Sequence, residues 1–198
     1  MKSLFSKNEL RKIYKEKRKQ WSSQQRLDFS QKIFKNYILQ FNPIENQSIH
    51  IFLPIEKFFE IDTKIWIDYY WKNHIRVYIP KMLGEEIISI RYFPETVLKQ
   101  NSWGIWEPET SEGEEVDFHQ IITPLLYADK LGNRVGYGKG FYDRFFKRNE
   151  NALKIGINYF GAGNEIIDAD SFDVKLDYLI SPEEILSFKE GNGAKLTK

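Results

Sequence analysis

The hydrophobic and polar positions near the start of the chain follow the period of an α-helix in two stretches. Each stretch opens with a pair of residues at capping-box spacing, Ser6 with Glu9 and Ser22 with Gln25, and apolar residues then recur three or four positions apart. We therefore expect one helix to begin near Lys7 and a second to begin directly after Ser22.

Short apolar runs rich in β-branched and aromatic residues follow these helices and predict buried strands. Further helices are expected after Asp62-Thr63 and from about Phe141, and a short helix is expected after Ser181. Two of the strands are expected to end at prolines, Pro54 and Pro80. The expected strands cover 49–53, 75–79, 87–93, 121–127, 154–160 and 172–180.

This alternation of strands and helices predicts an α/β fold in which one mostly parallel central sheet has helices on both faces. A chain of 198 residues is long enough for one domain with a substantial core, and its length does not require two. We expect a single domain over residues 1–188 and a flexible tail over 189–198.

Composition excludes several classes of function. The 29 basic and 28 acidic side chains give a net charge of +1, which lacks the broad positive field of a nucleic-acid-binding protein. The absence of cysteine excludes disulfides, thiolate zinc sites and cysteine nucleophiles, and the three histidines are too scattered for a local metal motif. No stretch approaches the roughly 20 apolar residues that span a membrane. A soluble, cytoplasmic, monomeric protein without nucleic-acid or membrane partners is expected.

A glycine-rich stretch at 133–144 carries the clearest candidate chemistry. Three alternating glycines would let the backbone approach a ligand closely, and the following helix would present free N–H groups at its start. Arg134 and Lys139 add positive charge, while Asp143 would lie in the first helical turn as a plausible Mg²⁺ ligand. The stretch therefore predicts a phosphate-binding loop in the order strand, loop, helix.

This loop has neither the spacing of a P-loop nor that of a dinucleotide-binding fold, so a glycine-rich turn without a ligand stays open as the alternative. Lys7 and Arg11 lie one helical turn apart and would suit an anion, but from charge alone a solvated basic face explains them better, because five more basic residues follow up to 19. Lys81 is a second candidate contact or a plain surface lysine. Trp103 and Trp106 would wall a ring-binding pocket or fill a core edge.

Taken together, these motifs resemble the 5-formyltetrahydrofolate cyclo-ligase family over nearly the whole chain. The order and spacing of the parts make the resemblance specific, whereas each part alone is weak. The parts are Lys7-x-x-Leu10-Arg11, Pro54 with Glu60-Ile61-Asp62-Thr63, Ile79-Pro80-Lys81, Gly104-Ile105-x-Glu107-Pro108, Asp129-x-x-Gly132 with 134–143, and Asp173-x-x-x-Asp177.

The resemblance implies a three-layer α/β/α sandwich and an ATP- and Mg²⁺-dependent ligase that closes 5-formyltetrahydrofolate to 5,10-methenyltetrahydrofolate, with release of ADP and phosphate. In that family route the formyl oxygen is phosphorylated first. The alternative is a non-catalytic nucleotide- or folate-binding module on the same fold. In the ligase interpretation, Lys139 and Arg134 would neutralise charge during catalysis.

The resemblance also implies the other roles. ATP would contact Lys7, Arg11, Arg134, Val135, Gly136, Tyr137, Gly138, Lys139, Gly140, Phe141 and Tyr142. The folate would contact Leu53, Glu60, Tyr137, Gly138, Lys139, Gly140 and Phe141, and Mg²⁺ would be held by Asp143 and Asp173. Two departures from the family pattern occur. The spacing after Leu53 leaves Glu56 as a competitor of Glu60, and Phe141 replaces a more usual tyrosine.

Overall fold

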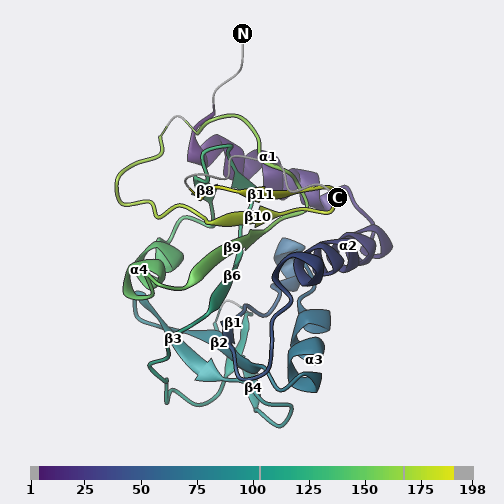
Figure 1. Ribbon diagram of the computed structural model, residues 1–198. Helices are drawn as coiled ribbons and strands as arrows, with labels where there is room; N and C mark the ends of the chain where they lie inside the picture. Colours follow the sequence, from purple (N-terminus) through teal and green to yellow (C-terminus); the bar gives the residue numbers. More distant parts are fainter. Residues whose placement is uncertain (1–4, 103, 167, 190–198) are drawn as a thin grey trace.

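The computed structural model describes residues 5–102, 104–166 and 168–189. Within these ranges a seven-stranded sheet, in the order β11-β10-β9-β6-β1-β2-β3, runs through the protein (Figure 1). Its five inner strands are parallel, and the edge strands β11 and β3 run antiparallel to their neighbours. The strands are β1 Ser48–His50, β2 Arg76–Leu83, β3 Glu86–Arg91, β6 Gln120–Pro124, β9 Leu153–Ile157, β10 Tyr178–Ile180 and β11 Ile185–Ser187.

Smaller elements surround this sheet. Two short hairpins lie outside it, and a 3-10 turn follows β1. The helices are α1 Lys7–Lys19, α2 Ser23–Phe41, α3 Lys64–Lys72 and α4 Phe141–Arg148; the hairpins pair β4 Leu98–Gln100 with β5 Trp106–Pro108 and β7 Tyr127–Ala128 with β8 Arg134–Val135; the 3-10 turn η1 is Glu56–Phe58. No helix in this described part of the chain is long and apolar enough to cross a membrane.

Side chains alternate between two apolar layers because successive residues of a strand point to opposite faces. Val77 and Ile122 pack in one cluster with Trp66 of α3 and residues of α2, whereas Ile121 packs in the other with Phe145 of α4. Figure 1 accordingly shows α2 and α3 on one side of the sheet and α4 on the other. The predicted α/β/α sandwich with a mostly parallel sheet is confirmed.

The first two helices begin where the capping signals place them. Ser6 and Ser22 are the N-caps of α1 and α2, and each makes the full reciprocal capping box with Glu9 or Gln25. The second helix ends where Asn42 adopts a left-handed conformation, which asparagine tolerates better than most residues. The helix after Thr63 also forms, as α3.

Several local predictions are wrong. β1 ends at His50 rather than at Pro54, and of the expected strand 172–180 only Tyr178–Ile180 forms a strand, β10. β2 does not end at Pro80 but continues to Leu83 along the antiparallel edge strand β3. Proline is tolerated there because β1 pairs only with the first three residues of β2, so one side of the strand lacks a neighbour at Pro80. The segment after Ser181 is the turn of the β10-β11 hairpin rather than a helix. The run 121–127 is broken after Pro124, and its last residue begins the separate β7-β8 hairpin.

Lys81 is not an open surface lysine, and it does not line the cavity found at the carboxyl ends of the inner strands. Its Nζ donates to three consecutive backbone carbonyls, those of Pro108, Glu109 and Thr110, at 2.8, 2.7 and 2.8 Å. An ammonium group has three protons, so all of them are used. Lys81 therefore holds the end of β5 against β2.

We expect Lys81→Met to lower the free energy of unfolding by about 1–3 kcal/mol, because three carbonyls lose a charged donor. Urea unfolding measures this loss. Lys99→Met is the control, since its nearest acidic oxygen lies 3.9 Å away and both side chains are exposed. Equal stability of the two variants would contradict the structural role given to Lys81.

His50 is fully buried at the centre of the sheet, against the rings of Phe118 and Phe145. Neither ring nitrogen has a hydrogen-bond partner among the described residues, and burial lowers the pKa of His50 from its ordinary 6.5 to about 3. The folded protein thus binds a proton here less readily than the unfolded chain. The free energy of unfolding is therefore highest, as far as His50 determines it, above pH 6.5, and it falls as the pH drops toward 3 because the unfolded chain then binds the proton.

We therefore expect His50→Leu to flatten the acid side of the stability profile. Below pH 6.5 the wild type should lose up to about 1.4 kcal/mol per pH unit more than the variant, because one extra proton is bound on unfolding. Urea unfolding across this range measures the difference. The exposed His74, replaced by asparagine to suit its positive φ, serves as the control and should leave the slope unchanged.

Candidate functional site

A cavity of about 650 Å³ opens at the carboxyl ends of the inner parallel strands. Phe52 and Leu53, which follow β1, and Pro124, which ends β6, contribute to its wall. β1 connects through α3 to β2 on one side, whereas β6 connects through α4 to β9 on the other. The cavity therefore lies where the direction of strand order reverses, the usual place for ligands in open α/β sheets.

The glycine-rich loop forms one wall of the cavity and leads into α4 as predicted, but the strand directly before it is the short β8 rather than the expected run 121–127. Gly138 and Gly140 have φ angles of 94° and 68°, which only glycine adopts readily. Gly138 also lies so close to α1 that an added Cβ would be 3.2 Å from the Arg11 guanidinium carbon. Gly140 is the N-cap of α4, so the free N–H groups of that helix begin at the loop.

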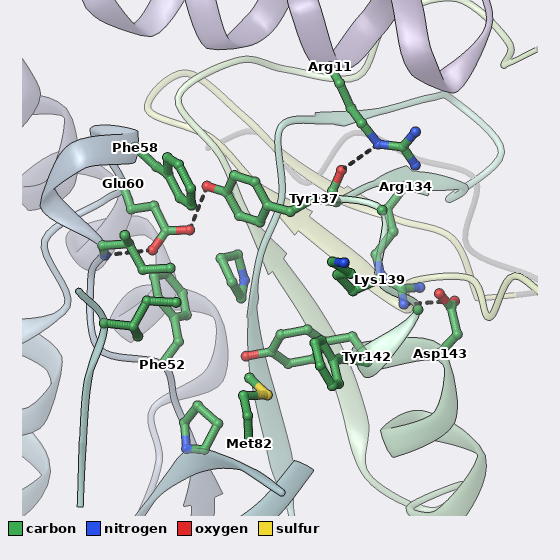
Figure 2. Close-up of a pocket in the computed structure, with 18 of the residues that line it drawn as sticks. Arg11, Phe52, Phe58, Glu60, Met82, Arg134, Tyr137, Lys139, Tyr142 and Asp143 are labelled. Carbon is green, nitrogen blue, oxygen red and sulfur yellow. Dashed lines mark hydrogen bonds and ion pairs between the residues drawn. The ribbon is translucent and has the colours of Figure 1, made fainter. Parts of the chain in front are cut away.

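One face of α1 lies across the cavity from the carboxyl ends of the strands. Lys7, Arg11 and Lys15 recur every four residues and all line the cavity. Arg11 Nε donates to the Gly136 carbonyl at 3.0 Å, which ties the helix to the loop (Figure 2). The basic pair predicted from the sequence is thus directed to the cavity rather than to a solvated face.

Arg134 and Asp143 form an ion pair beneath the loop. Arg134 Nη2 lies 2.8 Å from Asp143 Oδ1, and its Nη1 donates to the Val174 carbonyl (Figure 2). The guanidinium also stacks over the Phe146 ring, with its carbon 4.6 Å from the ring centroid. Burial lowers the pKa of Arg134, and the adjacent Asp143 opposes that effect. The guanidinium therefore stays charged and is held in one place.

Lys7 makes a second ion pair at the same end of the cavity. Its Nζ lies 2.6 Å from Asp173 Oδ2 and 3.7 Å from Asp170 Oδ2. Its backbone N–H donates to Asp168 Oδ1 at 2.7 Å, so the start of α1 is bonded to the 168–173 segment. Three aspartates about 160 residues from α1 are thereby brought to its first residue.

Glu60 marks the opposite end of the cavity. Its Oε1 accepts from the Tyr137 hydroxyl at 2.6 Å and its Oε2 accepts from the Ile55 N–H at 2.8 Å. The Tyr137 ring stacks on Phe58, with centroids 4.8 Å apart (Figure 2). Burial raises the pKa of Glu60, while these two hydrogen bonds and the charge of Arg18 lower it. The result is a buried carboxylate beside two stacked rings.

The structure brings almost all of the predicted site residues together around this cavity. They are Lys7, Arg11, Leu53, Glu60, Arg134, Gly136, Tyr137, Gly138, Lys139, Gly140, Phe141, Tyr142, Asp143 and Asp173. Val135 is the exception, because its buried side chain packs with Leu10, Tyr127 and Ile166 behind the loop. A side-chain contact of Val135 with a ligand in the cavity is therefore excluded.

The choice between the two glutamates has a structural answer. Glu56 is exposed on η1 and does not line the cavity, whereas Glu60 is 8% exposed and does. Of the two tryptophans considered for a ring pocket, Trp106 lines the cavity and Trp103 lies outside the described residues. The predicted tail at 189–198 likewise lies, except for Lys189, outside them.

Sequence reasoning missed several residues at this site. Lys15 and Arg18 were placed on a solvated basic face, yet Lys15 lines the cavity and Arg18 is 1% exposed. A signal for Arg18 was present, because Leu10, Tyr14 and Arg18 recur every four residues on the apolar face of α1. The other unpredicted lining residues are Phe52, Ile55, Lys57, Phe58, Pro80, Met82, Ile105, Glu107 and Pro124.

The described residues contain no group of three or more acidic or histidine side chains that would hold a metal alone. Asp143 and Asp173 nevertheless fit a Mg²⁺ site completed by a substrate, since Mg²⁺ commonly takes one or two carboxylates together with phosphate oxygens and waters. Asp143 uses only Oδ1 and Asp173 only Oδ2 in bonds to other described residues. One oxygen of each carboxylate is therefore left for such an ion.

Comparison with known proteins supplies the family. The 5-formyltetrahydrofolate cyclo-ligase of Haemophilus influenzae is 34% identical over 125 residues, which are 59% of this chain and 67% of that protein. The solved structure of 5,10-methenyltetrahydrofolate synthetase from Aquifex aeolicus superposes with a TM-score of 0.78 at 30% identity and covers 95% of both chains. The solved structure of the 5,10-methenyltetrahydrofolate synthetase from Mycoplasma pneumoniae superposes with a TM-score of 0.70 at 30% identity and covers 89% of this chain and 99% of that chain.

These likenesses extend over most of the chain rather than over the loop alone. A family model for the 5-formyltetrahydrofolate cyclo-ligase family matches residues 4–182, which include α1, the whole parallel part of the sheet and every residue placed around the cavity above. The chain therefore belongs to the 5-formyltetrahydrofolate cyclo-ligase family.

Proposed function

We propose that this ligase closes 5-formyltetrahydrofolate to 5,10-methenyltetrahydrofolate with consumption of ATP in the presence of Mg²⁺, releasing ADP and phosphate. One observation carries the proposal: a loop suited to phosphate and a buried carboxylate suited to a pterin open into the same cavity. Tyr137 belongs to the loop and also bonds Glu60, so the two ends are joined by a single side chain.

The loop end suits a triphosphate because positive charge converges on it. Cationic side chains outnumber anionic ones around the cavity, and the start of α4 adds N–H groups that favour an anion. The cations are Lys7, Arg11, Lys15, Lys57, Arg134 and Lys139, and the anions are Glu60, Glu107, Asp143 and Asp173. Lys139 is exposed and has no hydrogen bond or ion pair of its side chain to another described residue, so its ammonium is available to a phosphoryl group.

The Glu60 end suits the folate ring system. A buried carboxylate accepts N–H donors of a pterin, and the Phe58–Tyr137 stack offers a flat apolar surface beside it. Leu53 and Met82 add apolar wall. A pterin held by Glu60 would therefore direct the formyl group toward the loop.

The chemistry requires activation of a formyl oxygen, since an amide oxygen is a poor leaving group. Transfer of the γ-phosphoryl group to that oxygen makes it a phosphate ester, and attack of N10 on the same carbon then closes the ring. The carbon–oxygen bond breaks, phosphate departs with the former formyl oxygen, and the N10 proton leaves with it. Atoms and charge balance without a covalent bond to the protein.

The residues of this chain would position the reactants and neutralise charge during that transfer. Lys139 and Arg134 would spread the charge of the moving phosphoryl group, as positioned cations do in phosphoryl transfer. A Mg²⁺ ion held by Asp143 and Asp173 would supply further charge neutralisation at the phosphates. Lys7 and Arg11 would hold the remaining phosphates from α1, and the loop would bring the two substrates into line.

The test is formation of the methenyl chromophore by the purified protein with 5-formyltetrahydrofolate and Mg·ATP. We expect absorbance to grow with one ADP and one phosphate formed per product, and to stop when ATP is omitted or EDTA is added. Folded protein that binds ATP and the folate but yields no chromophore, beside an active control enzyme, would instead make it a non-catalytic binding module.

A further inference from the structure

Arg18 is a deeply buried charged side chain that bonds a residue of the cavity wall, although it does not line the cavity itself. It is 1% exposed and lies in the last turn of α1, where its guanidinium carbon is 5.6 Å from the Tyr159 ring centroid. Its Nη2 donates to the Leu125 carbonyl and to Asn158 Oδ1, the latter at 3.3 Å. A buried guanidinium is costly unless it is bonded, and these bonds hold it in one orientation.

The remaining bond of Arg18 leads to the cavity. Its Nη1 lies 3.2 Å from the Tyr137 hydroxyl, and that hydroxyl lies 2.6 Å from Glu60 Oε1. A guanidinium has donors and no acceptor, so the Tyr137 oxygen must accept from Arg18 and direct its single proton elsewhere. Glu60 Oε1 is the acceptor at hydrogen-bond distance, so the chain of bonds runs in one direction, from Arg18 through Tyr137 to Glu60.

We propose that Arg18 is a positioning residue that acts through the Tyr137 hydroxyl to keep Glu60 a charged acceptor for the N–H groups of the folate substrate, an inference that rests on the proposed function. Both oxygens of Glu60 accept a hydrogen bond from the protein, Oε1 from the Tyr137 hydroxyl and Oε2 from the Ile55 backbone N–H. Each oxygen accepts one hydrogen bond from the protein and keeps a further lone pair. Because Glu60 lines the cavity, these lone pairs are available to a ligand there.

The charges around Glu60 give the direction of the pH effect. The ionisable side chains that act on the Glu60 carboxyl are Tyr137 of the loop and Arg18 of α1. Glu60 in turn acts on Tyr142, at the start of α4, and on Tyr159, whose hydroxyl donates to the Glu60 backbone carbonyl at 2.8 Å. Burial raises the pKa of Glu60, and Arg18 opposes this. Removing Arg18 therefore raises that pKa further, so folate binding that needs the carboxylate fails at a higher pH.

The experiment compares four variants, Arg18→Met, Arg18→Lys, Tyr137→Phe and the double variant Arg18→Met with Tyr137→Phe. The chain offers a matched control, because Arg91 Nη1 lies 3.1 Å from the Tyr78 hydroxyl and that hydroxyl 3.1 Å from Glu114 Oε2, in a similar chain of bonds among residues that do not line the cavity. Each protein is assayed for the folate KM, the ATP KM and the acidic limb of kcat/KM.

We expect Arg18→Met and Tyr137→Phe each to raise the folate KM by roughly tenfold or more, the scale of a lost charge-assisted hydrogen bond, with the ATP KM within about twofold of the wild type. The acidic limb should move to higher pH in Arg18→Met and stay near the wild-type position in Arg18→Lys. In the double variant the effects should not add, because both changes break one chain of bonds. Arg91→Met should change none of these parameters.

Wild-type turnover separates this inference from the proposed function, which fails if the wild type makes no methenyl product. With an active wild type, an unchanged folate KM and acidic limb in Arg18→Met would overturn the role of Arg18, as would effects that add in the double variant. If Arg18→Met does not fold, the folate KM and the acidic limb of Arg18→Lys and Tyr137→Phe still test the inference. A Tyr137→Phe enzyme with wild-type folate KM and pH profile overturns the inference.

Discussion

Lys139→Ala is expected to lower kcat/KM for ATP by about a hundredfold, the scale seen when one positioned charge-stabilising group is removed from an active site. The reason lies in its surroundings: the side chain lines the cavity at the loop and bonds no other described residue. Its ammonium is therefore available to the phosphates and is not needed to hold the fold. Steady-state kinetics with varied ATP measures the loss.

The stability of the same variant decides how the result is interpreted. We expect the free energy of unfolding to stay within about 0.5 kcal/mol of the wild type, as for most exposed positions. Lys130→Ala, an exposed lysine between β7 and β8, is the matched control and should keep full activity. A parallel fall in activity and stability would favour a loop that is only a structural turn.

Glu60→Gln is expected to raise the folate KM by roughly tenfold to a hundredfold, because the variant loses a charged acceptor inside a buried site. The ATP KM should change little, since Glu60 lies at the end of the cavity away from the Lys7–Asp173 and Arg134–Asp143 pairs. Kinetics with each substrate varied in turn separates the two effects.

Glu60→Gln should have a free energy of unfolding close to that of the wild type. Burial raises the pKa of Glu60 above its unfolded value, so whatever stability this shift contributes is present at low pH and is lost as the pH rises through the folded pKa. At neutral pH a neutral glutamine avoids the cost of a buried charge, which offsets a weakened bond to Tyr137. Glu56→Gln, on the exposed face of η1, is the control. An equal rise in folate KM in both variants would contradict the assignment of Glu60.

The local parts of the fold followed from the sequence because their causes are local. The capping boxes at Ser6 and Ser22 and the glycines at Gly138 and Gly140 each act within a few residues, and the structure has the helices and the loop where these residues place them. The alternation of strands and helices along the chain likewise predicted a sheet covered on both faces. The glycine-rich loop was therefore recognisable before any contact was known.

The errors concern residues whose role depends on distant parts of the chain. Arginine is usually a surface residue. Arg18 can be buried because Leu125, Tyr137 and Asn158, more than 100 positions away, supply hydrogen-bond acceptors. Lys81 follows an expected strand end, yet its ammonium is saturated by carbonyls of 108–110. The spacing of Leu10, Tyr14 and Arg18 indicates the helix face on which Arg18 lies, but no spacing indicates the partners of Arg18 or Lys81, so these pairings required the structure.

The central claim is that ATP and the formylated folate meet in one cavity and that the γ-phosphoryl group passes to the formyl oxygen. Substrate labelled with ¹⁸O in the formyl group tests it directly, by mass spectrometry of the phosphate released during turnover with Mg·ATP. The account predicts that the label leaves the folate in the inorganic phosphate. Unlabelled phosphate, with the heavy oxygen recovered in water, would contradict it.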